Sequence, residues 1–548
     1  MHSPAASIKS GGQLYNPRSP FFRLLGITTF CLVFFIFTLR PTTDNVSHIT
    51  TPISSNYEQS KFTPPAPVAL TNQVPEINHP PPPAPLRPDC SINATRLKAL
   101  QEKYTLGDKL EYGQRYIKIK REDIPRKPLT NVRQPLFPED FEVVELANLP
   151  AQSSCWAPLE LPVSNSPYPN SVNASDLLFG ISTTYKRLYD EKITPIKEWA
   201  YWLTDGNGNS NGAGLILRLI DATEAQLNTT RRDLANLGMD VQVFNTESSI
   251  EMAKRYLSLL PALYHDLERK PRKWLAMCDD DTFFPSMHRL LAQLGTYNHA
   301  ADLYIGTLSE DVNNIQRHGS QAFGGAGVFF STHLAGIVAE NFDTCSTPAK
   351  IKEADSGWGP QGDILLRKCV YEHTEVSLTL LRELHQLDFT GDPAGFYESG
   401  IAPLSLHHFK GGTWHSAEPY EGAKITKVCG EDCFLQRFLF SDDFLVSNGF
   451  SVAYYPGGVT VDLNQMERTF HALPDDNGWN LDMMLGPGRH ALAETGRKVA
   501  WELKESNMEN GHLRQTYVRH FNDWRWKESP GGKDMFELDG ILELVWMP

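Results

Sequence analysis

The chain has 548 residues, and 51 Lys and Arg against 65 Asp and Glu leave a formal net charge of −14. This acidic balance argues against a general nucleic-acid binder, whose affinity depends on basic side chains that neutralise phosphates. Hydrophobic residues make up 41% of the chain, enough for a large core, so wholesale disorder is excluded as well. At about 100–200 residues per domain, the length predicts two to four units.

The N-terminus contains one long apolar run. Residues 1–23 are basic and carry no acid, and residues 24–39 (LLGITTFCLVFFIFTL) are followed by Arg40 and Pro41. As a helix the run is about 24 Å long, enough for a thin membrane if Phe21 and Phe22 are included. No small-residue cleavage site follows it. We expect a cytoplasmic tail at 1–23 and a transmembrane signal anchor at 24–39, with everything after it lumenal. A cleaved signal peptide and a buried core helix remain alternatives.

Residues 40–88 are rich in Thr, Ser, Asn and Pro and end in HPPPPAPLRP. Such a segment cannot bury enough apolar surface to fold, and its prolines favour an extended polyproline conformation. We interpret it as a disordered stem. A ligand for SH3 or WW domains is the competing interpretation, but those readers are cytosolic.

Two further features fit a lumenal chain. Four glycosylation tripeptides follow the apolar run, at Asn45, Asn93, Asn173 and Asn228. Seven cysteines follow it too, and the odd number leaves one unpaired, for which Cys278 in an apolar run is the natural candidate. Proximity alone suggests the bridges Cys345–Cys369, Cys429–Cys433 and Cys90–Cys155.

The segment 89–174 is mixed and charged, with a possible helix at 95–103 and no evident function. From residue 176 apolar strand patterns alternate with helical ones, which indicates a mostly parallel sheet with helices on both faces. The expected strands are 176–182, 214–221, 240–244 and 273–278. The expected helices are 184–199, 222–237 and 249–270, the last interrupted at Pro261. Beyond about residue 415, short strands at 450–455 and 460–463 predict a β-containing extension.

The most informative motif is Asp279, Asp280 and Asp281, directly after the apolar strand. Open α/β sheets bind ligands at the carboxyl ends of their strands. Crowded carboxylates repel one another unless a cation neutralises them, and Mg²⁺ or Mn²⁺ binds carboxylate and phosphate oxygens together. The motif therefore predicts a metal-held nucleotide diphosphate. A solvated acidic turn is the competing interpretation, and the flanking strand and Thr282-Phe283-Phe284 count against it.

Three weaker motifs follow in order. A small-residue turn, Gly324, Gly325, Ala326 and Gly327, would let backbone approach a ligand or a strand closely. Asp363 stands in the first turn of an expected helix, where it could equally be a helix-start residue. His407 and His408 follow an apolar segment, and alternation predicts that at most one faces a given site.

Taken together, Thr183-Thr184 after a strand, WLAMCDDDTFF, FGGAG, QGDILL and SLHH resemble the Fringe-like β-1,3-glycosyltransferases (glycosyltransferase family 31), most closely the fungal and plant Fringe-related branch. The likeness covers roughly residues 175–415. It implies a GT-A-type, Rossmann-like fold, a UDP-sugar donor and Mn²⁺ or another divalent cation.

The resemblance also implies residue roles. Asp281 and His407 would hold the metal, with His408 the alternative imidazole, and Asp363 would be the general base. The donor would be bound by Thr183, Thr184, Asp279, Asp280, Gly324, Gly325, Ala326 and Gly327. Relatives often carry two adjacent acids where this chain has Gly362-Asp363, so Asp355 remains an alternative base.

We therefore expect a GT-A domain at 175–415 between a lumenal segment at 89–174 and an extension at 416–548. The expected function is an inverting transfer of a sugar from a UDP-sugar to a hydroxyl of a glycan or glycoprotein, forming a β-1,3 linkage. The expected setting is the Golgi membrane, with one N-terminal helix and no nucleic-acid partner. A non-catalytic sugar-binding or chaperone-like relative and a metal-dependent hydrolase are the alternatives.

Overall fold

The computed structural model describes residues 90–150, 156–268, 270–471, 479–492, 495–528 and 532–548. All of them fall in one compact unit, Ala84–Pro548. The predicted tail, anchor and stem lie outside the described residues. Within the described ranges, no helix is long and apolar enough to cross a membrane.

The first sheet runs through the predicted α/β region. Its strands, within the described part of the chain and in spatial order, are β11 (Leu378–Leu380), β9 (Tyr304–Gly306), β10 (Val328–Ser331), β8 (Trp274–Met277), β5 (Leu177–Thr184), β6 (Gly214–Ile220) and β7 (Asp240–Thr246). The four strands β8, β5, β6 and β7 are mutually parallel, and β10 runs antiparallel to its neighbours. The mostly parallel sheet predicted from the sequence is confirmed.

Helices cover both faces of this sheet. Alternate residues of each strand point to opposite faces, so they join two separate hydrophobic clusters. In β5, Leu177, Phe179 and Ile181 join one core cluster, whereas Leu178 joins another. The first cluster contains residues of α4 (Ile196–Leu203), α5 (Glu224–Asn236) and α8 (Met287–Leu294). The second contains residues of α6 (Met252–Leu257), α7 (Leu259–Asp266), α10 (Thr332–Glu340) and α13 (Gly362–His373).

Two expected helices are divided. The stretch 184–199 forms α3 (Tyr185–Leu188) and α4, because Pro195 cannot sit inside a helix and instead precedes the first turn of α4. The stretch 249–270 breaks at Ser258 rather than at Pro261, which lies in the first turn of α7, where its missing N–H costs nothing.

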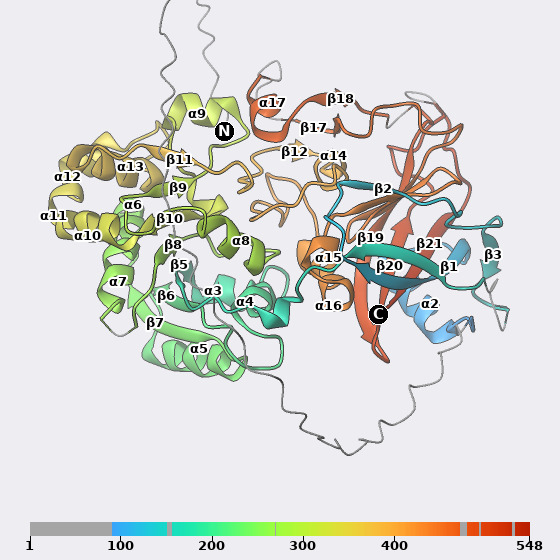
Figure 1. Cartoon of the computed structure of the whole chain (residues 1–548), viewed down its shortest axis with the longest axis horizontal. Helices are drawn as coiled ribbons and strands as arrows, with labels where there is room; N and C mark the ends of the chain where they lie inside the picture. Colours follow the sequence, from blue (N-terminus) through green and yellow to red (C-terminus); the bar gives the residue numbers. More distant parts are fainter. Residues whose placement is uncertain (1–89, 151–155, 269, 472–478, 493–494, 529–531) are drawn as a thin grey trace, which may run out of the picture. The chain divides into compact units, whose positions relative to one another are not determined.

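The second sheet joins segments from the two ends of the described chain. Within the described ranges its path is β2 (Leu129–Asn131), β13 (Arg437–Leu439), β14 (Phe444–Ser447), β15 (Ser451–Tyr454), β19 (Val499–Glu509), β20 (His512–Arg519), β21 (Asp539–Met547), β1 (Lys109–Glu122) and β3 (Glu142–Glu145), and β4 (Leu159–Ser164) also pairs with β1. Figure 1 shows β1, coloured near the start of the sequence, beside the red strands of the C-terminal region. The β-rich extension expected after residue 415 is therefore present, but it shares its sheet with strands from the segment 89–174.

Smaller elements complete the described fold. They are α2 (Ala94–Tyr104), α9 (Val312–His318), α11 (Phe342–Cys345), α12 (Pro348–Glu353), α14 (Ala394–Tyr397), α15 (Pro419–Ala423), α16 (Thr426–Cys429), α17 (Trp479–Leu485), β12 (Thr390–Gly391), β16 (Met466–Arg468), β17 (Phe470–His471), β18 (Gly488–His490) and the 3-10 turns η1 (Pro169–Ser171), η2 (Gly324–Ala326) and η3 (Glu431–Cys433). The expected strand at 460–463 is wrong: this segment is turn and loop, and pairing resumes at β16.

The cysteine predictions are largely confirmed. Cys345 and Cys369 form a disulfide between α11 and α13, and Cys429 is bonded to Cys433. Cys278 is a free, buried thiol, as expected. Cys90 is also disulfide-bonded, and its expected partner, Cys155, lies outside the described residues.

Candidate functional site

The acidic motif lies at the carboxyl ends of two parallel neighbours, β5 and β8. The Thr183 hydroxyl, near the end of β5, donates to Asp280, and the Arg187 guanidinium donates to the same carboxylate at 2.6 and 2.8 Å. The Thr184 hydroxyl accepts from the backbone N–H of Arg187 and so begins α3. Asp280 is therefore oriented by the end of β5 and by a cation one helical turn further on.

Asp279, Asp281 and His407 form a group that could hold a metal ion, with one ligand atom from each within 4.8 Å of the others. The His407 Nε2 atom lies 3.1 Å from Asp281 Oδ1 and 3.5 Å from Asp279 Oδ2. His407 is buried, whereas the Asp279 side chain is 48% exposed. Two carboxylates and an imidazole suit a divalent cation that keeps further positions for phosphate oxygens and water.

The charges in this group depend on one another. Burial would lower the pKa of His407, but Asp281 and Asp279 raise it to about 10, so the metal-free imidazole is protonated. Burial would raise the pKa of Asp281, but His407 and Arg187 hold it well below its usual range. The positive charge of the protonated His407 imidazole thus compensates the two carboxylates, as a bound cation would. A metal ion can bind His407 only after the imidazole loses this proton.

The glycine-rich turn η2 packs between the metal group and Asp363. A Cβ added at residue 325 would lie 2.1 Å from the His407 ring, and one at residue 324 would lie 2.2 Å from the Tyr256 hydroxyl. The carbonyl of Gly325 accepts from the Thr282 hydroxyl at 2.7 Å, and that of Ala326 accepts from Ser405 at 2.6 Å. The small residues are needed because two functional side chains pack directly on this backbone.

Asp363 is the second residue of α13 and lies on the other side of this turn, beside Tyr256 of α6. Burial and the charge of Asp279 raise the pKa of Asp363 to about 7, although Tyr256 and the backbone of Gly324 favour the ionised form. A carboxylate with a pKa near neutrality suits a general base. The alternative base, Asp355, is exposed and accepts hydrogen bonds from the backbone N–H groups of Gly357 and Gly359.

A cavity of about 560 Å³ opens beside the metal group, on the side of β5 and β6. Several predicted donor-binding residues line it: Thr183, Thr184, Asp279 and Asp280. Of the residues that sequence reasoning missed, Arg187, Lys410 and Trp414 also line it. The residues of the Gly324–Ala326 turn and Gly327 are not among its lining residues, so in this structure they position other side chains.

The prediction that at most one of the two histidines faces the site is wrong: both line the cavity and their ring centroids lie 3.8 Å apart, because the left-handed backbone of His408 breaks the strand-like alternation. His408 has a left-handed backbone conformation, lies 2.8 Å from the buried carboxylate of Asp388 and stacks on Trp414. Asn314 of α9 also donates to Asp388, at 2.8 Å. Asp388 therefore links His408, in the wall of the cavity, to Asn314 of α9. His407 instead contacts Asp279 and Asp281.

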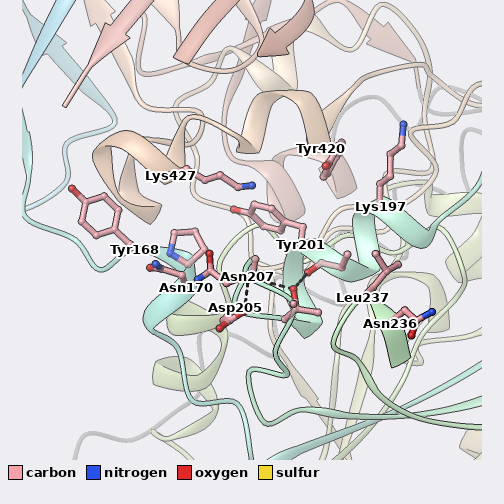
Figure 2. Close-up of a pocket in the computed structure, with 15 residues that line it drawn as sticks. Tyr168, Asn170, Lys197, Tyr201, Asp205, Asn207, Asn236, Leu237, Tyr420 and Lys427 are labelled. Carbon is pink, nitrogen blue, oxygen red and sulfur yellow. Dashed lines mark hydrogen bonds between the residues drawn. The ribbon is translucent and has the colours of Figure 1, made fainter. Parts of the chain in front are cut away.

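Figure 2 shows the residues that line a second cavity, of about 620 Å³. Tyr201, Asp205 and Leu237 line it, and the loops that carry Asp205 and Leu237 precede β6 and β7. Tyr420 and Lys427 of the C-terminal region complete it. Because it lies at the amino ends of the strands, it is separate from the metal group.

Sequence reasoning missed Arg187, Tyr256 and Asp388. Each lies in a helix or loop without a motif of its own, and each becomes relevant only through a neighbour distant in the chain. For Arg187, the only signal in the sequence was its position one helical turn after Thr184, and that signal is weak.

Comparison with known proteins finds one family model and several solved structures that are similar to parts of this chain. The model of the Fringe-like family matches residues 219–410. Among solved structures, mouse xyloside xylosyltransferase 1 is 13% identical, with a TM-score of 0.24 over 37% of this chain and 84% of its own. The glycosyltransferase GlyE of Streptococcus pneumoniae TIGR4 is 13% identical, with a TM-score of 0.28 over 49% of this chain and 62% of its own.

The galactosyltransferase LgtC, solved with donor and acceptor sugar analogues, is 11% identical, with a TM-score of 0.25 over 40% of this chain and 77% of its own. No curated protein matches the chain. The Fringe-like match confirms the predicted resemblance over residues 219–410. The fungal and plant branch stays a prediction.

Proposed function

We propose that this protein is a metal-dependent, inverting glycosyltransferase that moves a sugar from a UDP-sugar to a hydroxyl of a glycan or glycoprotein, forming a β-1,3 linkage. One observation carries the proposal: the group Asp279, Asp281 and His407 adjoins a cavity of about 560 Å³, and Asp363 lies across a glycine turn from it. The proposed setting is the Golgi lumen, with the chain anchored through residues 24–39.

The three metal-ligand candidates, Asp279, Asp281 and His407, fit Mn²⁺ or a similar cation, because they combine hard carboxylate oxygens with one imidazole. When bound, such an ion would neutralise the negative charge that develops on the diphosphate leaving group. Arg187 holds Asp280 and Asp281 in position, and Gly325 leaves room for the His407 ring.

The proposed chemical step is a single displacement. The acceptor oxygen forms a bond to the anomeric carbon as the bond from that carbon to the UDP oxygen breaks, which inverts the anomeric centre. Asp363 accepts the proton of the acceptor hydroxyl. Two observations support this role: Asp363 lies beside the glycine turn that also contacts the metal-group residue His407, and burial raises its pKa to about 7.

The test measures UDP release by the full-length protein with a panel of UDP-sugars and simple glycosides, with Mn²⁺ and with a chelator. We expect one donor to give Mn²⁺-dependent release that Asp363→Asn abolishes while UDP and Mn²⁺ binding persist. Asp355→Asn is the matched control, since its amide oxygen can still accept the two loop N–H groups, and it should turn over normally. Absence of release with every donor would favour a binding protein, and normal turnover by Asp363→Asn would remove Asp363 from its role.

A further inference from the structure

Two tryptophans, Trp358 and Trp524, are the most exposed large apolar side chains among the described residues, at 69% and 60%. An indole presents a large, flat apolar face, which can pack on the apolar face of a sugar ring. Trp524 lies in the loop between β20 and β21, whereas Trp358 lies four residues before the start of α13 and five before Asp363.

Backbone and side-chain hydrogen bonds close the loop that carries Trp358. Asp355 accepts from the N–H groups of Gly357 and Gly359 at 2.8 and 3.0 Å, and it forms a β-bridge with Pro360. The backbone N–H of Gln361 then donates to the carbonyl of Ala354 at 3.0 Å. The indole is thus presented on a short closed loop directly before the helix that positions Asp363, so little ordering would be needed on binding.

One face of the indole is already occupied. The Arg317 guanidinium, from α9, lies 3.5 Å from the ring centroid. This contact fixes the ring plane, and the high exposure of Trp358 leaves the other face open to solvent. A flat apolar surface with one free face is the shape that a pyranose ring needs for stacking.

The end of α9 that carries Arg317 packs against α13, the helix that contains Asp363. A Cβ at Gly319, directly after α9, would meet the Arg367 guanidinium, so the end of α9 packs on α13. Arg367 is four residues after Asp363 and shares its helix face. At the other end of the same short helix, Asn314 binds Asp388, the partner of His408. The Arg317–Trp358 pair therefore lies on the α13 side of the site, whereas the donor cavity lies on the β5 and β6 side.

We infer that Trp358, held by Arg317, stacks on a pyranose ring of the acceptor glycan and sets the affinity for the acceptor. This inference rests on the proposed function and adds the acceptor subsite to it. Five residues span at most about 18 Å of chain, so the stacked ring is the ring whose hydroxyl reacts or one close to it along the acceptor. Trp358 is a binding residue here and takes no part in proton transfer.

The test uses full-length protein, Mn²⁺, the active UDP-sugar and methyl glycosides of common hexoses and of their disaccharides, which lack an aromatic group of their own and offer both the reacting ring and a neighbouring one. We expect Trp358→Ala to raise the acceptor KM about tenfold or more, as loss of roughly 1.4 kcal/mol predicts. Trp358→Phe should restore most of the affinity, and Arg317→Met should give an intermediate KM. The donor KM and the slow acceptor-free release of UDP should stay unchanged in all three.

Trp524→Ala is the matched control and should leave the acceptor KM unchanged. An unchanged acceptor KM in Trp358→Ala, or an increase in Trp524→Ala alone, would overturn the inference while leaving the transferase activity established. If the wild-type chain releases no UDP at all, the proposed function fails. Saturation-transfer NMR with the same glycosides then decides the subsite by itself: a signal lost in Trp358→Ala supports it, and a signal retained there refutes it.

Discussion

Asp363 connects the geometry of the site with its expected pH dependence. Its carboxylate is held by burial and by the Asp279 charge at a pKa of about 7, above the ordinary value near 4 for an aspartate. A general base must be ionised to accept a proton, so the protonated form that prevails below this pKa is inactive.

We therefore expect the transfer rate to fall about tenfold per pH unit on the acid side of this pKa. A bound cation would neutralise Asp279, but burial, the larger cause, remains, so the inflection should stay well above pH 4. The measurement is the pH profile of kcat/KM for the acceptor between pH 4.5 and 8. A flat profile across this range would contradict the assignment of Asp363 as the base.

At the scale of elements, the strands that carry the candidate site could be predicted from the sequence, because their residue pattern is local. The strands β5, β6 and β8 are apolar runs buried on both faces, so their bounds came within two residues, and the acids after β8 were expected at a strand end. Tyr256 was not predictable, because a tyrosine in an amphipathic helix gives no sign of which loop its hydroxyl reaches. The role of Gly324 and Gly325 also differed from the predicted one. They were expected to bind the donor, but they leave room for the side chains of Tyr256 and His407.

The turn η2 yields a prediction of its own. Gly325→Ala places a methyl group within the volume of the His407 ring, so the imidazole must move away from Asp281. We expect loss of Mn²⁺ binding by isothermal titration and at least a hundredfold loss of UDP release, because a metal ligand is displaced. The residue lies in a buried turn, so the circular dichroism spectrum must first show that the variant is folded.

Gly107→Ala is the control for this substitution. Its Cβ would lie 3.4 Å or more from its neighbours, an ordinary contact, in a loop ahead of β1. Full activity in Gly107→Ala with loss in Gly325→Ala would assign the effect to His407. Unchanged Mn²⁺ affinity in a folded Gly325→Ala variant would mean that His407 is not a ligand.

For the whole molecule, the second sheet explains what a segment-by-segment interpretation could not. Strand β1 pairs with β21 in parallel from Leu110 with Asp539 to Lys118 with Met547. Partners more than 400 residues apart leave no local pattern, so the sequence predicted two separate segments. Arg126 adds a second link, donating to carbonyls of Gly400, Ile401 and Asp432. The N-terminal segment and the extension are therefore one structural layer attached to the catalytic region.

This pairing predicts that the region 175–415 needs the extension to remain soluble when the N-terminal segment is present. A chain of residues 90–415 lacks β21, so the edge of β1 that pairs with β21 would be unpaired. Buried residues such as Leu110 and Ile117 would also become exposed. We expect aggregation by size-exclusion chromatography and light scattering, whereas residues 90–548 should be monodisperse. Co-expression of residues 416–548 as a separate chain should restore soluble protein, because the β1 and β21 pairing can form between chains. A monomeric 90–415 chain with cooperative thermal unfolding would show instead that the catalytic region is independent of the sheet beside it.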